Sequence, residues 1–208
     1  MSGIQLLERA KQRGKEIGKI RCLLILIILL LSSCATKGSD NFSRGNPYGA
    51  PRPYGRHPGI DFMVPVGTPV IAPADGTISA IRKFGGAEPW HGGWMVQLSH
   101  AADFHSVYVH LTEVRVEMEK SMKRGQLIGL SGASNSGHAH LHFGICRKEG
   151  RCFEYYETED PDKFWLGNKP QCFDPNKDYS NYSQKEITLP VACGDYSKML
   201  KSNIRKRD

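Results

Sequence analysis

The sequence lacks several features that would point to common protein classes. Its 208 residues contain no apolar run of the roughly 17–25 residues that a membrane-spanning helix needs. No stretch keeps a helical periodicity over three or four turns, so a mainly α-helical domain is not expected. There is no glycine-rich phosphate loop and no interleaving of aromatic and basic residues, so nucleotide and nucleic-acid binding are not indicated. A His-Glu-x-x-His motif is also absent, which excludes the helical two-histidine metalloproteases.

Acidic residues are not in excess either. The formal net charge is +7, from 28 Lys and Arg against 21 Asp and Glu. Residues 1–33 hold six of these cations and only two anions, Glu8 and Glu16, which leaves the rest of the chain at +3. The basic balance therefore belongs largely to the N-terminal segment and does not indicate a nucleic-acid partner.

The N-terminal segment is organised like a bacterial export signal. A polar, basic stretch precedes the short apolar run 22–31 and then Leu31-Ser32-Ser33-Cys34, which resembles a lipobox. We therefore predict a signal peptide over residues 1–33, acylation of Cys34 and a lipidated tether over residues 34–46. Several acyl chains would give a stable membrane anchor. Ala35 in place of Asp favours the outer membrane of the bacterial cell envelope, facing the periplasm. An ordinary cleaved signal and an uncleaved anchor are the alternatives.

Residues 47–152 have the pattern of one all-β domain. Short runs rich in Val, Ile, Thr and Tyr are separated by Gly, Pro and Asp-Gly turn signals. Asp75-Gly76 predicts a hairpin turn between the strands on either side of it. About 100 residues are enough to bury one core. The expected strands are Thr68–Pro73, Thr77–Arg82, Trp94–Leu98, Ser106–Leu111, Gln126–Leu130 and His140–Ile145.

The most informative segment is His-Ala-His-Leu-His-Phe-Gly-Ile at residues 138–145. Successive side chains of a strand point to opposite faces. His140 and His142 would then share one face, opposite the apolar Leu141 and Phe143. The apolar face can be buried while the two imidazoles open onto a groove. Paired imidazoles on a rigid strand suit zinc binding and acid–base catalysis.

Two other segments supply groups of the same kind. His57-Pro58-Gly59-Ile60-Asp61 offers an imidazole and a carboxylate four residues apart, and zinc accepts both as ligands. The segment Val107–Leu111 alternates, so its odd-numbered apolar residues are expected on one face and His110 with Tyr108 on the other. One pair of histidines is weak evidence, but the three segments together predict a common site.

In this order, His-x-x-x-Asp, Tyr-x-His-Leu and His-Leu-His-Phe make the sequence resemble the lysostaphin-type (LytM-like) zinc endopeptidases, which cut bacterial peptidoglycan. The resemblance covers residues from about Asn46 to Ile145. It departs from the family before His-Leu-His, where Gly137-His138-Ala139 stands in place of the usual Gly-Pro. The framework segments that also match are Gly59–Phe62, Val64–Val70, Ala72–Ile78 and Gly125–Gly129.

The resemblance implies a small barrel-sandwich hybrid, of the duplicated hybrid motif type, with a groove. It implies that His57, Asp61 and His142 bind one Zn²⁺ per chain and leave a fourth tetrahedral position for water. His110 and His140 match the family's two catalytic histidines. Zinc lowers the pKa of bound water from about 15.7 towards 7. One unligated imidazole can then accept the proton of the water, while the other helps to stabilise the oxyanion.

The remaining histidines are expected to lie outside the chemistry. His138 is assigned to a loop before the strand. His105 has the opposite parity to His110, so an unbroken strand points it away from the site. His91 and His100 are given structural or solvent-exposed roles.

Four cysteines remain beyond the predicted lipidation site, and an even number in an exported protein indicates disulfides, with three pairings open. Cys146 and Cys152 flank a polar turn, so a hairpin bridge is expected there. Cys172 and Cys193 would then fasten a C-terminal extension, residues 153–208. A second metal site is the alternative, but the spacings lack paired Cys-x-x-Cys motifs.

The favoured hypothesis is a zinc-dependent endopeptidase that hydrolyses peptidoglycan stem peptides or crosslinks during cell-wall remodelling. Peptidoglycan and a membrane, through the lipid anchor, are the expected partners. The alternative is a non-catalytic peptidoglycan-binding regulator that activates cell-wall amidases, with an amidase or another envelope protein as its partner. A third hypothesis is an envelope lipoprotein with a closed, structural zinc site. The presence of all five site residues favours catalysis.

Overall fold

β-strands make up most of the regular structure in the computed structural model. The predicted signal peptide 1–33, Cys34 and the first part of the tether lie outside the described residues. Within the described part, no helix is long and apolar enough to cross a membrane. The structure describes residues 43–53, 55–89 and 91–194.

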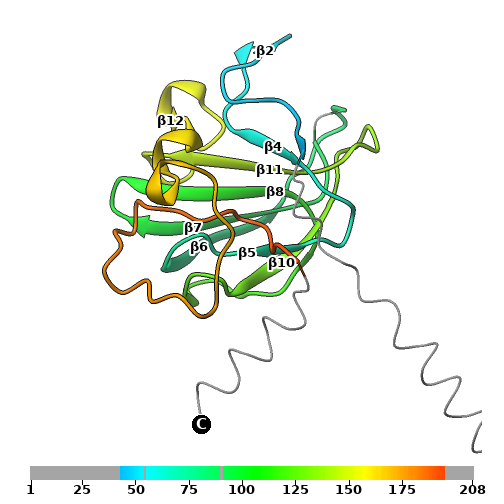
Figure 1. The fold of residues 1–208 in the computed structure, drawn as a ribbon. Helices are drawn as coiled ribbons and strands as arrows, with labels where there is room; N and C mark the ends of the chain where they lie inside the picture. The colour runs from blue at the N-terminus through cyan, green and yellow to red at the C-terminus, as the bar shows by residue number, and fades with distance from the viewer. Residues whose placement is uncertain (1–42, 54, 90, 195–208) are drawn as a thin grey trace, which may run out of the picture. The chain divides into compact units, whose positions relative to one another are not determined.

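Ten strands form one antiparallel sheet in the order β1-β4-β11-β10-β8-β7-β6-β9, with β5 beside β10 and β12 beside β11 (Figure 1). The strands β2 and β3 form a separate two-stranded ribbon. No α-helix occurs among the described residues, and the prediction of an all-β domain is confirmed. The bounds are β1 Ser43–Arg44, β2 Pro51–Arg52, β3 Gly55–Arg56, β4 Ile60–Met63, β5 Pro69–Ile71, β6 Gly76–Lys83, β7 Trp94–Ala101, β8 Phe104–Val114, β9 Ser121–Met122, β10 Leu127–Ala133, β11 Ala139–Cys146 and β12 Thr158–Glu159, with 3₁₀ turns at Tyr155–Glu157, Pro161–Phe164 and Leu166–Asn168.

The main core lies on the apolar face of β11. Leu141, Phe143 and Ile145 are fully buried, as the alternation predicts. The ring of Phe143 lies 6.3 Å from that of Phe62 on β4 and 5.5 Å from that of Tyr108 on β8, measured between centroids. Burial of each such side chain stabilises the fold by about 1.5–3 kcal/mol. This packing fixes the strand that carries His140 and His142.

The turn at Asp75-Gly76 does not join a hairpin, and that prediction is wrong. β5 pairs with β10, whereas β6 pairs with β7 and β9, so the flanking strands have different partners. The carboxylate of Asp75 accepts hydrogen bonds from Nζ of Lys123 at 2.7 Å and from the backbone N–H of Arg124 at 2.9 Å. These contacts with a distant segment determine the path of the chain at Asp75-Gly76, and they override the local preference of Asp-Gly for a hairpin turn.

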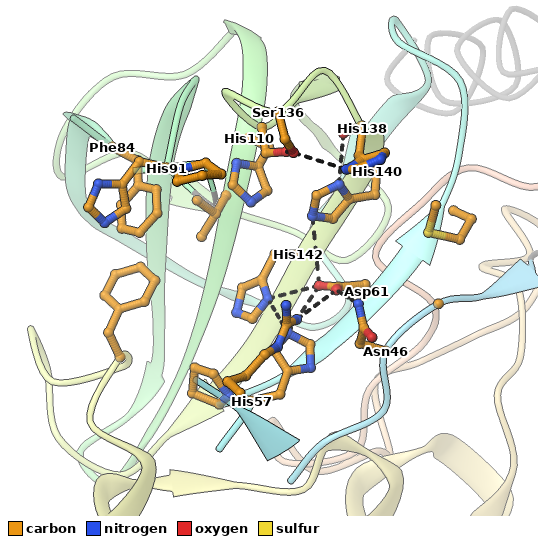
Figure 2. A pocket seen from close by; sticks show the side chains of 18 of the residues that line it. Asn46, His57, Asp61, Phe84, His91, His110, Ser136, His138, His140 and His142 are labelled. Carbon is orange, nitrogen blue, oxygen red and sulfur yellow. Dashed lines mark hydrogen bonds and ion pairs between the residues drawn. The ribbon is translucent and has the colours of Figure 1, made fainter. Parts of the chain in front are cut away.

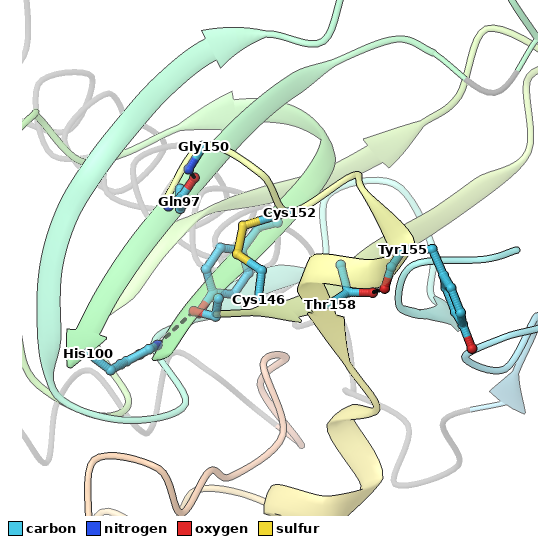
Figure 3. The surroundings of a disulfide bond; sticks show 9 residues. Gln97, His100, Cys146, Gly150, Cys152, Tyr155 and Thr158 are labelled. Atoms are coloured by element: carbon cyan, nitrogen blue, oxygen red, sulfur yellow. Dashed lines mark hydrogen bonds between the residues drawn. A yellow bond between two sulfur atoms is a disulfide. The ribbon is translucent and has the colours of Figure 1, made fainter. Parts of the chain in front are cut away.

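Both predicted disulfides are present. Cys146–Cys152 closes the turn that follows β11 (Figure 3), and Cys172–Cys193 closes a loop within the extension. The half-cystines Cys146 and Cys152 are buried together with Val107 and Val109 of β8 in a second, smaller apolar cluster. The first disulfide therefore ties the end of β11 to the packing beneath β8.

The C-terminal extension shares the core of the β domain. Ile187 and Val191 are fully buried in the main cluster. Val191 forms a bridge with Val70 of β5, and Ile187 forms one with Trp165. The packed core thus continues beyond residue 152 into the predicted C-terminal extension.

The last residues of the predicted tether, 43–46, pair with the β domain. Ser43 and Arg44 of β1 pair with Met63 and Phe62 of β4. The backbone carbonyl of Asn46 accepts a hydrogen bond from the N–H of Asp61 at 3.0 Å. Main-chain pairing orders these residues, and a Gly- and Ser-rich composition gives no signal for it.

Candidate active site

Strand pairing brings the predicted metal ligands together. In the antiparallel ladder of β4 and β11, His142 stands opposite Asp61. His57 precedes β4, and its side chain returns to the same point (Figure 2). The backbone at Gly59 can lie this close to β11 only because glycine has no Cβ, which would collide with the carbonyl of Phe143 and crowd the His142 ring. All three side chains are buried.

Their ligand atoms form a nearly equilateral triangle. His57 Nε2 lies 2.9 Å from His142 Nδ1, and each of these nitrogens lies 3.1 Å from Oδ1 of Asp61. A tetrahedral site with bonds of about 2.0–2.1 Å separates its ligand atoms by about 3.3 Å. The triangle therefore matches the size of such a site.

The hydrogen-bonding inventory of these three groups is incomplete without a cation. His57 Nδ1 donates to the carbonyl of Pro47 at 2.9 Å, which leaves only a lone pair on its Nε2. Neutral His142 has one proton for two nitrogens, and its Nε2 is buried without a hydrogen-bond partner among the described residues. At most one proton is thus available to two imidazole nitrogens and a carboxylate oxygen. A divalent metal ion would satisfy all three.

Electrostatics keep these groups in the forms that bind metal. Burial opposes ionisation of Asp61, but the close imidazoles of His142 and His57 outweigh it and hold the pKa of this carboxyl well below its usual range. Burial lowers the pKa of His142, against the opposing influence of Asp61, so this imidazole stays neutral. The donor set is a carboxylate and two imidazoles, which suits zinc.

His110 reaches the site because β8 contains a bulge. The register pairs Trp94 with Leu111 and Val96 with Tyr108, so Met95 alone faces two residues of β8. His110 itself has a φ of 66°, which is uncommon for a residue other than glycine. The bulge interrupts the alternation and re-aims the side chain.

The expected pairing of His110 with Tyr108 on one face is therefore wrong. Tyr108 and Leu111 are both buried in the main core, whereas Val109 and His110 line the groove. A regular strand would have placed Tyr108 and His110 on the same face. The extra residue of the bulge reverses the parity after Val109.

The two predicted catalytic histidines face each other, with ring centroids 4.5 Å apart. His110 Nδ1 donates to the carbonyl of Gly92 at 3.0 Å, and His140 Nδ1 donates to the carbonyl of His138 at 2.9 Å. These bonds fix the tautomers, so in both rings Nε2 is the nitrogen left for chemistry. His140 Nε2 lies 3.9 Å from Oδ1 of Asp61, next to the triangle (Figure 2).

Burial, together with the nearby His140 and His142, lowers the pKa of His110 to about 4, against the opposing hydrogen bond to Gly92. His110 is consequently neutral at physiological pH. A neutral imidazole with a fixed Nδ1–H can accept a proton at Nε2.

The site lies in a groove of about 940 Å³ with two unlike sides. Arg44 and Arg52, from β1 and β2, line one side. The other side is aromatic: Phe84 stacks on Phe153 with centroids 4.8 Å apart, and His91 meets the Phe84 ring edge-on at 4.8 Å. Figure 2 shows Phe84 and His91 across the histidines from Asn46.

Several of these lining residues were missed by the sequence analysis. Asn46 Nδ2 and Arg52 Nη2 donate to Oδ2 of Asp61 at 2.9 and 3.2 Å, although no local pattern distinguishes either residue. Phe153 follows the disulfide directly, and only the fold shows that this position enters the groove. His91 was expected to be structural or solvent-exposed, but it lines the groove.

The other histidines lie much as expected. His138 is an exposed loop residue before β11, and it also lines the groove. His105 is buried on β8 and is not among the residues that line the groove. His100 is buried in a hydrogen-bonded network that includes Ser106.

Residues 55–154 match the model of Peptidase family M23. The chain belongs to this family. It is 36% identical over 90 residues to the peptidoglycan DD-endopeptidase ShyB of Vibrio cholerae, a match that covers 43% of this chain and 20% of ShyB. It is 34% identical over 131 residues to the glycyl-glycine endopeptidase ALE-1 of Staphylococcus capitis, which covers 60% of this chain and 34% of ALE-1.

The M23 fold is also shared with a solved structure. The catalytic domain of the antimicrobial peptidase lysostaphin from Staphylococcus simulans superposes with a TM-score of 0.50 at 32% identity. This match covers 60% of the present chain and 92% of that domain. The chain thus spans nearly all of a lysostaphin catalytic domain but only a fifth to a third of the two full-length relatives above.

Proposed function

We propose that this M23 protein is a zinc-dependent endopeptidase that hydrolyses peptide bonds in peptidoglycan. The observation that carries the proposal is the buried triangle of His57, Asp61 and His142, whose ligand atoms lie 2.9–3.1 Å apart and share at most one proton. These residues would hold one Zn²⁺. When bound, the ion would make a coordinated water more acidic and polarise the scissile carbonyl.

The protein's own groups supply the proton transfers. His110 is neutral, its Nδ1–H is held by Gly92, and its Nε2 accepts the proton of the attacking water. His140, whose Nδ1–H is held by the carbonyl of His138, directs Nε2 towards the same space, and its doubly protonated form would donate a hydrogen bond from Nε2 to the developing oxyanion. The proton taken up by His110 then passes to the departing amine.

The substrate and the cellular place complete the proposal. The relatives ShyB and ALE-1 are named as endopeptidases, of which ShyB acts on peptidoglycan, and this supports stem peptides or crosslinks as the target. We place the protein at the outer membrane, facing the periplasm, through a lipid on Cys34. Mass spectrometry of the N-terminal peptide tests this: an acylated Cys34 supports the anchor, and an unmodified N-terminus excludes it.

Digestion of purified sacculi tests the activity. A soluble form that begins after Cys34 is incubated with sacculi, with and without a chelator, and released fragments are identified by mass spectrometry. We expect fragments that disappear with the chelator and return when zinc is added. If folded, zinc-loaded protein releases nothing, the enzyme proposal is wrong. Activation of purified amidases would then be measured, since a regulator is the alternative.

A further inference from the structure

The groove carries an unbalanced charge. Among its lining residues Asp61 is the single carboxylate, whereas Arg44 and Arg52 both reach the groove. The charge of Asp61 is already committed to its two histidines and to the proposed metal ion. Bound zinc would make the balance still more positive. A groove of this kind attracts anionic ligands and orients them.

The two arginines are not equivalent. Arg44 Nη1 lies 2.8 Å from Oδ2 of Asp162, so its charge is compensated by an anion outside the ligand triangle. Arg52 has Asp61 as its only ion-pair partner among the described residues, through one contact of 3.2 Å to Oδ2. A guanidinium has five N–H donors. Most donors of Arg52 are therefore available, and its side chain is 37% exposed at the mouth of the groove.

Arg52 is also close to the chemistry. Oδ2 of Asp61, which it contacts, belongs to the same carboxylate whose Oδ1 forms the ligand triangle. An anion bound by Arg52 would thus lie within about one residue of a peptide bond placed over the triangle. The opposite side of the groove, with Phe84 and Phe153, offers no comparable charge.

We propose that Arg52 binds a free carboxylate of the substrate peptide beside the scissile bond, and so selects carboxylate-bearing stem peptides over neutral peptide bridges. The planar fork of Arg matches a carboxylate with two parallel hydrogen bonds, which gives both affinity and orientation. Arg44, paired with Asp162, contributes only to the general field. The inference rests on the proposed endopeptidase function and names the substrate class for that site.

A matched pair of synthetic crosslinked peptides tests the proposal. The two peptides are identical except that the carboxylate next to the scissile bond is free in one and a carboxamide in the other. For the unmodified protein we expect kcat/KM to favour the free carboxylate by about tenfold or more, mainly through KM, since a hydrogen bond to a charged group has this strength. The preference should weaken as salt is raised.

Variants of Arg52 show whether this residue causes the preference for the free carboxylate. In Arg52→Gln the ratio of the two kcat/KM values should fall to about one, and Arg52→Lys should be intermediate because it keeps the charge without the fork. Arg56→Gln is the matched control: Arg56 lies on the paired strand β3, outside the groove lining, and donates to the carbonyl of Gly49. It should keep the ratio of the unmodified protein. Zinc content is measured for every variant.

Each alternative outcome has a distinct meaning. If the unmodified, zinc-loaded protein cleaves both peptides equally well, the carboxylate proposal is overturned while the endopeptidase function stands. If it cleaves neither peptide nor sacculi, the proposed function fails first. If zinc-loaded Arg52→Gln slows both peptides by the same factor with the ratio unchanged, Arg52 only positions Asp61, and the specificity role is excluded.

Discussion

Two buried histidine clusters lie in the same β domain, and they differ in hydrogen bonding. In the closed cluster each polar side-chain atom has a hydrogen-bond partner, whereas in the open cluster the acceptors outnumber the protons available to them. In the first, His100 Nδ1 donates to the carbonyl of Asp75 at 2.7 Å, and its Nε2 lies 2.7 Å from Oγ of Ser106. Ser106 must therefore donate to His100 and accept from Tyr108, whose hydroxyl lies 2.7 Å away. Burial raises the pKa of Tyr108, so it remains a donor. Each polar side-chain atom of His100, Ser106 and Tyr108 therefore has a hydrogen-bond partner.

The second cluster, His57, Asp61 and His142, cannot close in the same way. Its lone pairs converge at 2.9–3.1 Å, and one buried ring nitrogen has no partner among the described residues. Buried polar groups are normally satisfied, so converging acceptors of this kind suit a bound cation. Burial alone does not separate a structural histidine from a ligand, because both clusters are buried. The count of donors and acceptors does.

The largest expected effect follows from removing a ligand of the open cluster. We expect His142→Ala to lose both bound zinc and cleavage of sacculi, because two remaining ligands hold zinc poorly. Atomic emission on the purified variant measures the metal. His100→Gln, from the closed cluster, is the control and should keep a full equivalent of zinc. A full zinc content in His142→Ala would refute its role as a ligand.

Removing a catalytic imidazole should separate binding from turnover. We expect His110→Ala to retain zinc but to lose about 10²–10⁴-fold in kcat, the usual contribution of a general base. His138→Ala is the control, since the backbone carbonyl of His138, and not its ring, holds His140. Near-normal turnover by His110→Ala would remove His110 from the mechanism.

How far the sequence predicts these clusters depends on what sets each side-chain direction. Period-two alternation was enough to place His140 and His142 on one face of β11, because that strand is regular and its other face is buried. The same rule failed for His110, because the bulge is set by pairing with β7, which local sequence does not encode. His57 and Asp61 were candidates because of their residue types and spacing, but their assignment as ligands came from the family resemblance.

Long-range contacts account for the other differences. Arg52 and Asn46 reach Asp61 across loops, and their neighbours in sequence carry no signal of it. The expected hairpin at Asp75-Gly76 is absent because Lys123 and Arg124, far along the chain, bind the Asp75 carboxylate. The hydrogen-bonded network of His100 likewise could not be predicted from the sequence, since its partners Asp75 and Ser106 are brought together only by the fold.

The closed cluster predicts a pH-dependent stability. Burial lowers the pKa of His100 to about 4, from about 6.5 in the unfolded chain. Between these values the unfolded state binds the proton more tightly, so the contribution is fully present above about pH 6.5 and is lost as pH falls towards 4, by about 3 kcal/mol. Urea unfolding at several pH values measures this, with His100→Gln as the comparison. An equal pH slope in both proteins would exclude His100 as its source.

The smallest expected effect sharpens the comparison from inside the closed cluster. Ser106→Ala should lower the free energy of unfolding by about 1–3 kcal/mol, because it leaves the Tyr108 hydroxyl and His100 Nε2 buried without their shared partner. Adding Tyr108→Phe removes one of the two stranded groups, so the double variant should lose less than the sum of the single losses. Urea unfolding of the four proteins gives this coupling. Strictly additive losses would mean that the three side chains do not act as one network, and that closure is not what distinguishes this cluster from the metal site.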